Sequence, residues 1–299
     1  MRILGRAGHQ VTDVTRPAAV SVILPARTDS PGLRLALEAL KRQTFSGAYE
    51  VVVVCPEDLN LAPYPRSRLV RECRNGPGAA LNAGVRAACG DILAFTDIDC
   101  VPASRWIEAG VIDLESMRRP GLVAGRIVQT ARDAQRPNAV ETFEVDSSLR
   151  QDEDVRHGVA SASNLFITSA LFDAVGPFRE DLASKSDWEF CLRAREAGYD
   201  LVYCHDAEVS HRVIATWYGL WRSKLRLARG MLELGNARRR SGNEMRREAL
   251  AELRLPVRTM LRALSSNRPV ATRVGLVAAI VVTRASYVAG WVLAEVRTR

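Results

Sequence analysis

Two carboxylates, Asp97 and Asp99, lie one residue apart at the end of an apolar run over 92–96. The run predicts a buried strand, and side chains two residues apart in an extended chain share a face, about 6 to 7 Å apart. Ligands of α/β sheets collect at the carboxyl ends of the strands. Carboxylate oxygens at such an edge suit Mg²⁺ or Mn²⁺ rather than zinc. The pair predicts a divalent cation site or, as the plainer alternative, an acidic turn.

The elements before this pair resemble a nucleotide-binding α/β half. Near-continuous apolar runs at 19–25 and 50–54 predict strands covered on both faces. A helical repeat of leucines lies between them at 31–43. Strand, helix and strand in this order imply a parallel unit with a right-handed crossover. A weaker third strand is expected at 68–73.

A glycine-rich turn at 76–84 opens an alanine-rich helix just before the acidic strand. Glycines let a backbone approach a ligand closely, and a helix start favours anions. The turn therefore predicts either an anion contact or a plain strand-to-helix loop.

The second half carries further helices and strands. A polar stretch at 131–157 shows little pattern, and long stretches of this kind near a site often form binding or gating loops. The other elements are expected at 102–117, 122–128, 164–167, 171–176, 186–193, 201–204 and 207–210.

Composition defines a globular protein with an uneven charge distribution. The 299 residues are 47% hydrophobic and 25% charged, which is ordinary for a globular chain. The formal charge of +8 divides into −4 for 1–215 and +12 for 216–299. The six cysteines form no CxxC pair, so we expect reduced thiols of a cytoplasmic protein and no zinc site. The start lacks an apolar core typical of a secretory signal, and the catalytic part is expected in the cytosol.

The basic tail ends in an apolar segment at 274–294 with one charge, Arg284, in its middle. Three placements remain open: a helix lying on a membrane, a helix packed on the core, and a true span. Anionic lipid attracts basic clusters at about 1 kcal/mol per near-surface charge. No nucleic acid is expected as a partner, because no recognised motif accompanies the charge and the interleaved residues are mostly aliphatic.

Seven blocks in a fixed order resemble the family 2 glycosyltransferases of the GT-A fold. They span about 18–215 and read VSVILPA (20–26), LEALKRQT (37–44), GPGAALNAG (76–84), GDILAFTDID (90–99), SNLFITSALFDAVGPFRED (163–181), SDWEFCLRAREAGYDLVY (186–203) and AEVSHR (207–212). The resemblance implies an α/β protein with a Rossmann-like mixed sheet flanked by helices.

The resemblance also implies roles for particular residues. Asp97 and Asp99 match the acidic motif that holds Mg²⁺ or Mn²⁺ against the diphosphate of a nucleotide-sugar donor. Asp187 matches the general base of inverting members, with a helix N-cap as the alternative. His211 falls where some members supply a further metal ligand, with a structural histidine as the alternative.

Five other positions match the nucleotide side of the family's site. Pro25, Ala26 and Arg27 match the end of the first strand, which lines the nucleotide. Asn82 and Asp91 match positions near the nucleoside and the sheet edge. Together with Asp97 they form the predicted cofactor-binding set.

The chain departs from the family pattern at three positions. Cys55 ends the second strand where an Asp is common, Leu81 replaces a common Arg, and Ser186 replaces a common Glu. These departures support an alternative function, a catalytically altered nucleotide-binding scaffold. The leading expectation is an inverting glycosyltransferase that moves a sugar to a hydroxyl of a saccharide or lipid-linked acceptor.

The expected domain organisation follows from the blocks and the charge. It has an N-terminal arm at 1–17, a catalytic domain at 18–215 and a basic helical tail at 216–299. The catalytic domain divides into a nucleotide-binding half, 18–100, and an acceptor half, 101–215. The tail is expected to associate with the inner face of the cell membrane.

Overall fold

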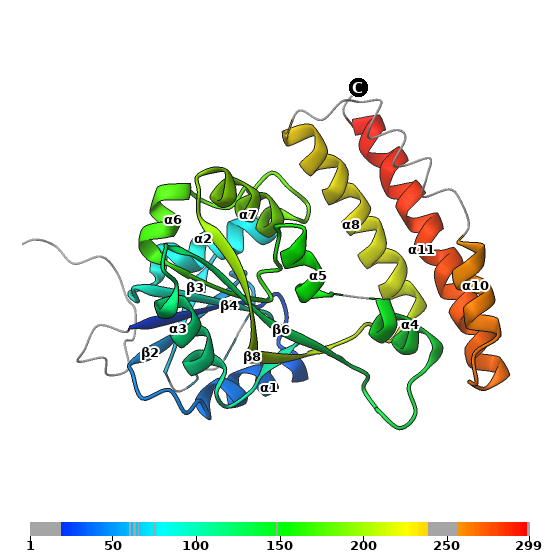
Figure 1. Ribbon diagram of the computed structural model, residues 1–299, viewed down its shortest axis with the longest axis horizontal. Coiled ribbons are helices and arrows are strands. Elements are labelled where there is room, and N and C mark those ends of the chain that lie inside the picture. The colour runs from blue at the N-terminus through cyan, green and yellow to red at the C-terminus, as the bar shows by residue number, and fades with distance from the viewer. Residues whose placement is uncertain are drawn as a thin grey trace, which may run out of the picture.

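The computed structural model describes residues 19–59, 61, 64, 66–73, 76–147, 149–238 and 256–297. The predicted N-terminal arm at 1–17 lies outside the described residues. One mixed sheet forms the centre of the described chain, and helices cover both of its faces (Figure 1).

The sheet has eight strands in the order β3-β2-β1-β4-β7-β6-β8-β5. The first four in this order run parallel, whereas β7 is antiparallel to both β4 and β6, and β5 is antiparallel to β8. The bounds are β1 Val20–Pro25, β2 Tyr49–Cys55, β3 Ser67–Arg71, β4 Ile92–Thr96, β5 Cys100–Pro102, β6 Gly121–Thr130, β7 Asn164–Thr168 and β8 Asp200–Arg212. The predicted parallel half is therefore confirmed, and its carboxyl ends lie along one edge.

Two helical layers cover the sheet. Alternate side chains of β1 pack against the two layers, because Val22 belongs to one apolar cluster and Ile23 to the other. The first layer contains α1 Pro31–Lys41 and α3 Trp106–Ser116, and the second contains α2 Pro77–Ala87, α6 Ser169–Val175 and α7 Ser186–Glu196. Both clusters are fully buried at their centres, which fixes the strand register on each face.

The stretch at 131–157 contains two helices, α4 Ala139–Ser147 and α5 Gln151–Arg156, so the expectation of a patternless loop was wrong for much of it. Asn138 starts α4, because its side chain accepts from the backbone N–H groups of Val140 and Glu141. Glu141 in turn accepts from the N–H of Asn138 at 2.9 Å. This reciprocal capping box is visible in the sequence as Asn-x-x-Glu.

The final strand also differs from the expectation. Residues 201–204 and 207–210 belong to one long strand, β8, rather than two, and the register against β6 shifts between Gly125 and Arg126. The extra residues at 205–207 form the irregularity. A bulge of this kind bends and re-aims a strand, and here it directs the end of β8 toward β5.

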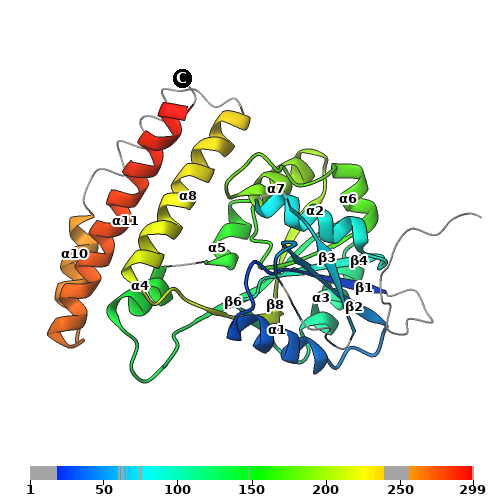
Figure 2. The same ribbon diagram turned by 180° about the vertical axis from the view of Figure 1, so that it is seen from behind.

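The tail helices form a layer to one side of the sheet (Figures 1 and 2). They are α8 Trp217–Ala237, α10 Val257–Leu264 and α11 Val270–Arg297. Helix α11 packs closely on its neighbours through glycines: a side chain at Gly275 would meet Ala139 of α4, and one at Gly290 would meet the Leu225 carbonyl of α8 at 2.8 Å. Part of this helix, Val270–Leu293, is long and apolar enough to cross a membrane by length and composition.

Candidate active site

The carboxyl ends of β1, β2 and β4 meet at one point of the sheet edge. Ile23 pairs with Phe95, so Pro25 and Asp97, each two residues further along, end at the same level. The backbone N–H of Ala26 donates to the Val54 carbonyl at 2.7 Å, which ties the end of β1 to β2. Ala26 is buried and Arg27 is exposed. The predicted nucleotide residues of β1 thus lie at the edge that carries the acidic pair.

Asp97 is held by the segment that precedes β7. Its Oδ2 accepts a 2.6 Å hydrogen bond from the Ser163 hydroxyl. Burial raises the pKa of Asp97 to about 6; the charges of Asp99 and Asp187 add to this, while the Ser163 bond and His211 oppose it. The position therefore concentrates negative charge that a nearby cation would stabilise.

Asp99 and His211 are brought together by strand pairing between segments more than a hundred residues apart. Cys100 of β5 pairs with His211 of β8, and the Arg212 N–H donates to the Asp99 carbonyl at 2.8 Å. As a result Asp99 Oδ2 lies 3.4 Å from His211 Nε2. The ligand atoms of Asp99, Cys100 and His211 all lie within 4.8 Å of one another, and Asp97 is not part of this trio.

The ring of His211 is oriented from its other side. Gln129 lies directly across from His211 in the β6–β8 pairing, and its Oε1 lies 3.0 Å from His211 Nδ1. The Gln129 amide nitrogen donates to the Leu149 carbonyl at 3.4 Å, which turns its oxygen toward the ring and favours the tautomer with the proton on Nδ1. Burial lowers the pKa of His211, but the hydrogen bond and charge of Asp99 outweigh this and leave the pKa raised.

The donor set fits a divalent cation. The Nε2 lone pair of His211 and the Asp99 carboxylate face one another, and a proton or a metal ion must lie between them to make that contact favourable. Burial raises the pKa of Cys100 well above its usual range in the metal-free protein. Hard cations such as Mg²⁺ and Mn²⁺ prefer oxygen ligands to thiolate, so Cys100 is the least suited donor of the trio. The carboxylate oxygens suit Mg²⁺ or Mn²⁺, whereas the imidazole is the ligand of this set that later first-row metals prefer.

Asp187 lies in the first turn of α7 but does not cap it, because the cap position is Lys185. Its two oxygens accept backbone N–H bonds from Ala162 at 3.0 Å and from Trp188 at 2.9 Å. Ala162 is the neighbour of Ser163, which holds Asp97. The segment before β7 therefore orients both carboxylates, and the charge of Asp187 reaches Asp97.

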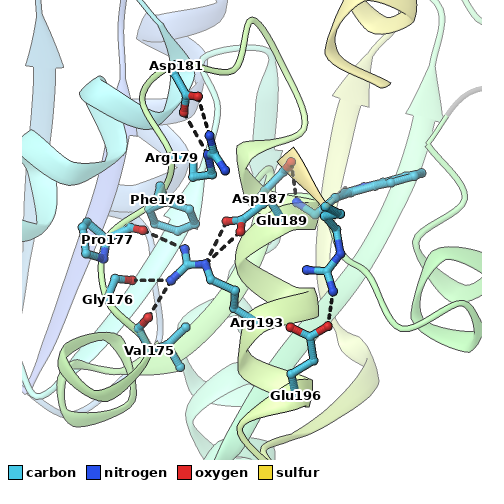
Figure 3. A network of polar contacts seen from close by, with 12 residues as sticks. Val175, Gly176, Pro177, Phe178, Arg179, Asp181, Asp187, Glu189, Arg193 and Glu196 are labelled. Carbon is cyan, nitrogen blue, oxygen red and sulfur yellow. Dashed lines mark hydrogen bonds and ion pairs between the residues drawn. The ribbon is translucent and has the colours of Figure 1, made fainter. Parts of the chain in front are cut away.

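Helix α7 is fixed to the loop before it by Arg193 (Figure 3). The Arg193 guanidinium donates to both carboxylate oxygens of Glu189 and to the carbonyls of Val175 and Pro177, the latter at 2.7 Å. Glu189 is buried, so Arg193 supplies its countercharge. This clamp sets the position of α7 and, with it, the position of Asp187.

Asn82, which was predicted to lie near the nucleoside, forms hydrogen bonds within the protein. It is buried, and its side chain exchanges hydrogen bonds with the backbone of Phe178 at 2.8 and 2.9 Å and donates to Glu180. The nearby Gly78 makes a close approach, because a side chain there would lie 2.1 Å from the Arg179 carbonyl. The glycine-rich turn thus packs against the chain's own loop at 178–180.

Asp91 does not lie at the site. It precedes β4, is exposed, and is six residues before Asp97. An extended chain of that length spans about 20 Å, so Asp91 lies at the amino end of β4, opposite to the carboxyl end that carries Asp97. The expectation that it contributes to the nucleotide-binding edge is corrected on this ground.

Sequence reasoning missed two residues that the structure adds to the site, Ser163 and Gln129. Ser163 begins a block already singled out by its order, and a polar residue directly before a buried strand could have marked it. Gln129 carries no local signal, because only the pairing of β6 with β8 shows that it faces His211.

Comparison with known proteins agrees with this geometry. Residues 21–162 match the model of glycosyl transferase family 2. The chain is 30% identical over 228 residues to the glycosyltransferase AglE of Haloferax volcanii, covering 72% of this chain and 73% of that protein. It is also 30% identical over 216 residues to the pre-mycofactocin glycosyltransferase of Mycobacterium tuberculosis, covering 64% of this chain and 42% of that protein.

A solved structure shares the fold over nearly the whole length. The mannosyltransferase PcManGT of Pyrobaculum calidifontis, in complex with GDP-Man and Mn²⁺, superposes with a TM-score of 0.63 at 21% identity, over 97% of this chain and 91% of that chain. The mixed sheet of this chain therefore has the GT-A fold. The chain belongs to glycosyl transferase family 2.

Proposed function

We propose that this enzyme is an inverting glycosyltransferase that moves a sugar from a nucleotide-diphosphate donor to an acceptor hydroxyl, with Mg²⁺ or Mn²⁺ at the donor diphosphate. The observation that carries the proposal is the arrangement of three carboxylates around one segment. Asp97 and Asp187 are both held by residues 162–163, and Asp99 follows Asp97 beside His211. The nucleotide-sugar and Mn²⁺ bound to the mannosyltransferase of the same fold support the choice of donor and cofactor.

Each part of the arrangement has a role in such a transfer. Asp99 and His211 would hold the cation, with Asp97 beside them, and the cation would stabilise the negative charge of the leaving diphosphate. Pro25, Ala26 and Arg27 would line the nucleotide at the end of β1. Asp187 would accept the proton of the attacking hydroxyl. Its two backbone hydrogen bonds fix the direction of the carboxylate, which favours in-line attack from the face opposite the leaving group.

A thermal-shift screen tests the donor assignment. Nucleoside diphosphates with Mn²⁺ or Mg²⁺ should raise the melting temperature, and the same nucleotides without metal should raise it less, because ligand binding to the folded state stabilises it. The base that gives the largest rise is then assayed as its nucleotide-sugar. A metal-dependent shift with neither hydrolysis nor transfer over a broad acceptor panel would favour the scaffold alternative, and no shift with any nucleotide would reject both.

The exposed face of the tail supports a membrane surface as a further partner. Val270, Val274 and Val281 are exposed on α11, while its opposite face packs on α4 and α8. Helix α10 exposes Leu261 and Leu264. Its Arg258 and Arg262 stand four residues apart, at a spacing suited to anionic headgroups. We propose on this basis that the enzyme binds the inner face of the cell membrane.

Replacing Leu261 by aspartate is expected to weaken binding to anionic vesicles at least about tenfold. The change removes one apolar anchor of α10 and adds a charge that anionic lipid repels. Co-sedimentation with vesicles of mixed neutral and anionic phospholipid measures the effect. Leu35→Asp is the matched control, since Leu35 is an exposed leucine of α1, on the catalytic body. Equal losses for both variants, or no loss for either, would argue against a membrane-binding tail.

A further inference from the structure

The short segment before β7 holds two of the carboxylates of the site. The Ala162 N–H donates to Asp187 at 3.0 Å, and the Ser163 hydroxyl donates to Asp97 at 2.6 Å. Ala162 and Ser163 are neighbours in the chain, so the placement of this segment sets where the proposed base lies relative to the acidic pair. A residue that places the segment therefore bears on the chemistry without touching a substrate.

Gln151, the first residue of α5, brackets this segment. Its Oε1 accepts the Ser161 N–H at 2.9 Å, and its amide nitrogen donates to the carbonyls of Asn164 at 2.9 Å and of Ser161 at 3.3 Å. The side chain is only 2% exposed. Burying an amide is costly unless its polar atoms are bonded, and here the oxygen and the nitrogen both have partners. Gln151 thus grips the residues on either side of the two that hold the carboxylates.

Helix α5 gives Gln151 a firm support. The helix packs against β6 and β8, and Val155 contacts the apolar cluster that contains Ala162. The Ser161 hydroxyl in turn donates to the Ser163 hydroxyl oxygen at 3.0 Å, so the one hydroxyl hydrogen of Ser163 is left for Asp97. A continuous chain of contacts therefore runs from α5 to the carboxylates.

The far end of the segment is fixed to the sheet independently of Gln151. The side chain of Asn164 is fully buried and accepts from the Trp106 indole at 2.8 Å. It also donates to the carbonyls of Arg126 at 2.9 Å and of Ala207 at 2.8 Å. Loss of Gln151 would therefore release residues 161–163 while Asn164 and the sheet stay in place.

We propose that Gln151 is a positioning residue for the sugar transfer. It places residues 161–163 so that Asp187 is aligned with the donor side of the site, where Asp97 lies. This inference rests on the proposed function and adds a residue to its machinery. Gln151 contacts neither substrate nor cation and acts through Ala162 and Ser163. A misplacement of reacting groups by about 1 Å is enough to lower a rate about 100-fold.

Gln151→Met tests the proposal, because methionine has a similar length and lacks the three hydrogen bonds of the amide. We expect kcat for transfer to fall about 10- to 100-fold, with the KM for nucleotide-sugar within about threefold of its original value. The KM is spared because Asp99 and His211 are held by the pairing of β5 with β8, which Gln151 does not contact. Initial rates over a range of nucleotide-sugar concentrations, at saturating Mn²⁺ and acceptor, separate kcat from KM.

Hydrogen exchange gives a second readout that needs neither substrate nor metal. In Gln151→Met the backbone N–H groups of Ser161 and Ala162 should exchange about tenfold faster or more, because the segment opens locally more often. Where the methionine variant is poorly folded, Gln151→Asn replaces it. Asparagine keeps a buried amide but lacks one methylene group, which withdraws the amide from both ends of the segment, so the same changes are expected.

Ser21→Ala is the matched control for a general loss of stability. Ser21 is fully buried and also forms three hydrogen bonds, with the Glu50 carboxylate and with the N–H groups of Cys89 and Gly90. These bonds lie near the amino end of β1, away from the site. The variant should be destabilised through its unpaired N–H groups, while kcat and the exchange of residues 161–163 stay within about twofold.

A double-mutant cycle tests whether Gln151 acts through the base. In the Asp187→Asn background there is no base left to misplace, so adding Gln151→Met should lower kcat by less than about threefold more. A merely structural effect would instead multiply with the loss caused by Asp187→Asn.

The possible failures can be told apart. Normal kcat in a folded Gln151→Met enzyme, an equal loss of kcat in Ser21→Ala, or multiplied losses in the double variant would each overturn the positioning role and leave the proposed function standing. Neither transfer nor hydrolysis of any nucleotide-sugar by the unaltered chain would reject the proposed function, and this inference with it.

Discussion

Replacing Asp187 by asparagine is expected to lower kcat for sugar transfer about 100- to 10,000-fold, the usual contribution of a positioned general base. The amide cannot take the proton of the attacking hydroxyl. Nucleotide affinity should change little, because Asp187 contacts Ala162 and Trp188 in the acceptor half rather than the end of β1. Initial rates with saturating nucleotide-sugar and Mn²⁺ measure the effect.

One further variant and a stability measurement make this result specific. Asp181→Asn removes a carboxylate of the same loop region that pairs with Arg179 at the surface, and should keep its rate within about twofold. In Asp187→Asn, the amide NH₂ group replaces one of the two oxygens that accept backbone N–H bonds, so two donors face one another. This loss can destabilise the fold, and the unfolding free energy of the variant must therefore be measured in parallel. A folded Asp187→Asn enzyme that retains near-normal kcat would remove Asp187 from the role of base.

Replacing Asp99 by asparagine is expected to abolish the metal-dependent part of the thermal shift with nucleoside diphosphate and to lower transfer at least about 100-fold. The change removes the carboxylate that faces His211 Nε2, and with it a charged ligand for the cation that would stabilise the leaving diphosphate. Titration of Mn²⁺ at fixed nucleotide concentration, followed by melting temperature and by rate, measures both effects.

Cys100→Ala separates the carboxylate from the thiol of the same trio. The buried thiol of Cys100 contributes packing, and Mn²⁺ prefers oxygen ligands to thiolate, so the variant should lose some stability and keep the Mn²⁺ dependence of the enzyme. If Cys100→Ala lost the metal response while Asp99→Asn kept it, the assignment of the cation ligands would be wrong.

Local patterns predicted most of the parallel half of the fold. The apolar runs that became β1, β2 and β4 are buried on both faces, so burial made them continuous and easy to recognise. The acidic pair followed β4 directly, and its place at the carboxyl edge follows from strand direction alone. The missed helix α4 was predictable too, since its capping box lies within four residues, Asn138 to Glu141.

Contacts between distant segments were not predictable from the same patterns. The role of Asn82 near the nucleoside stays a prediction from its family position, and only the tertiary structure shows that its polar atoms bond to the loop at 178–180, about a hundred residues away. Asp91 was misplaced although its position directly before the predicted strand at 92–96 already put it at the opposite end of that strand from Asp97. The tail looked like a separate appendage, yet α8 fastens the segment that leads into α7.

The sequence by itself determined the family, the strand that presents Asp97 and Asp99, and the basic, apolar character of the tail, because each of these depends on residues that are neighbours in the chain. Tertiary structure alone decided that His211 faces Asp99, that Gln129 orients its ring, and that α8 is hydrogen-bonded to the segment before α7. These contacts depend on strand pairing and helix docking over long loops, whose register is set by packing of the whole core rather than by any local pattern.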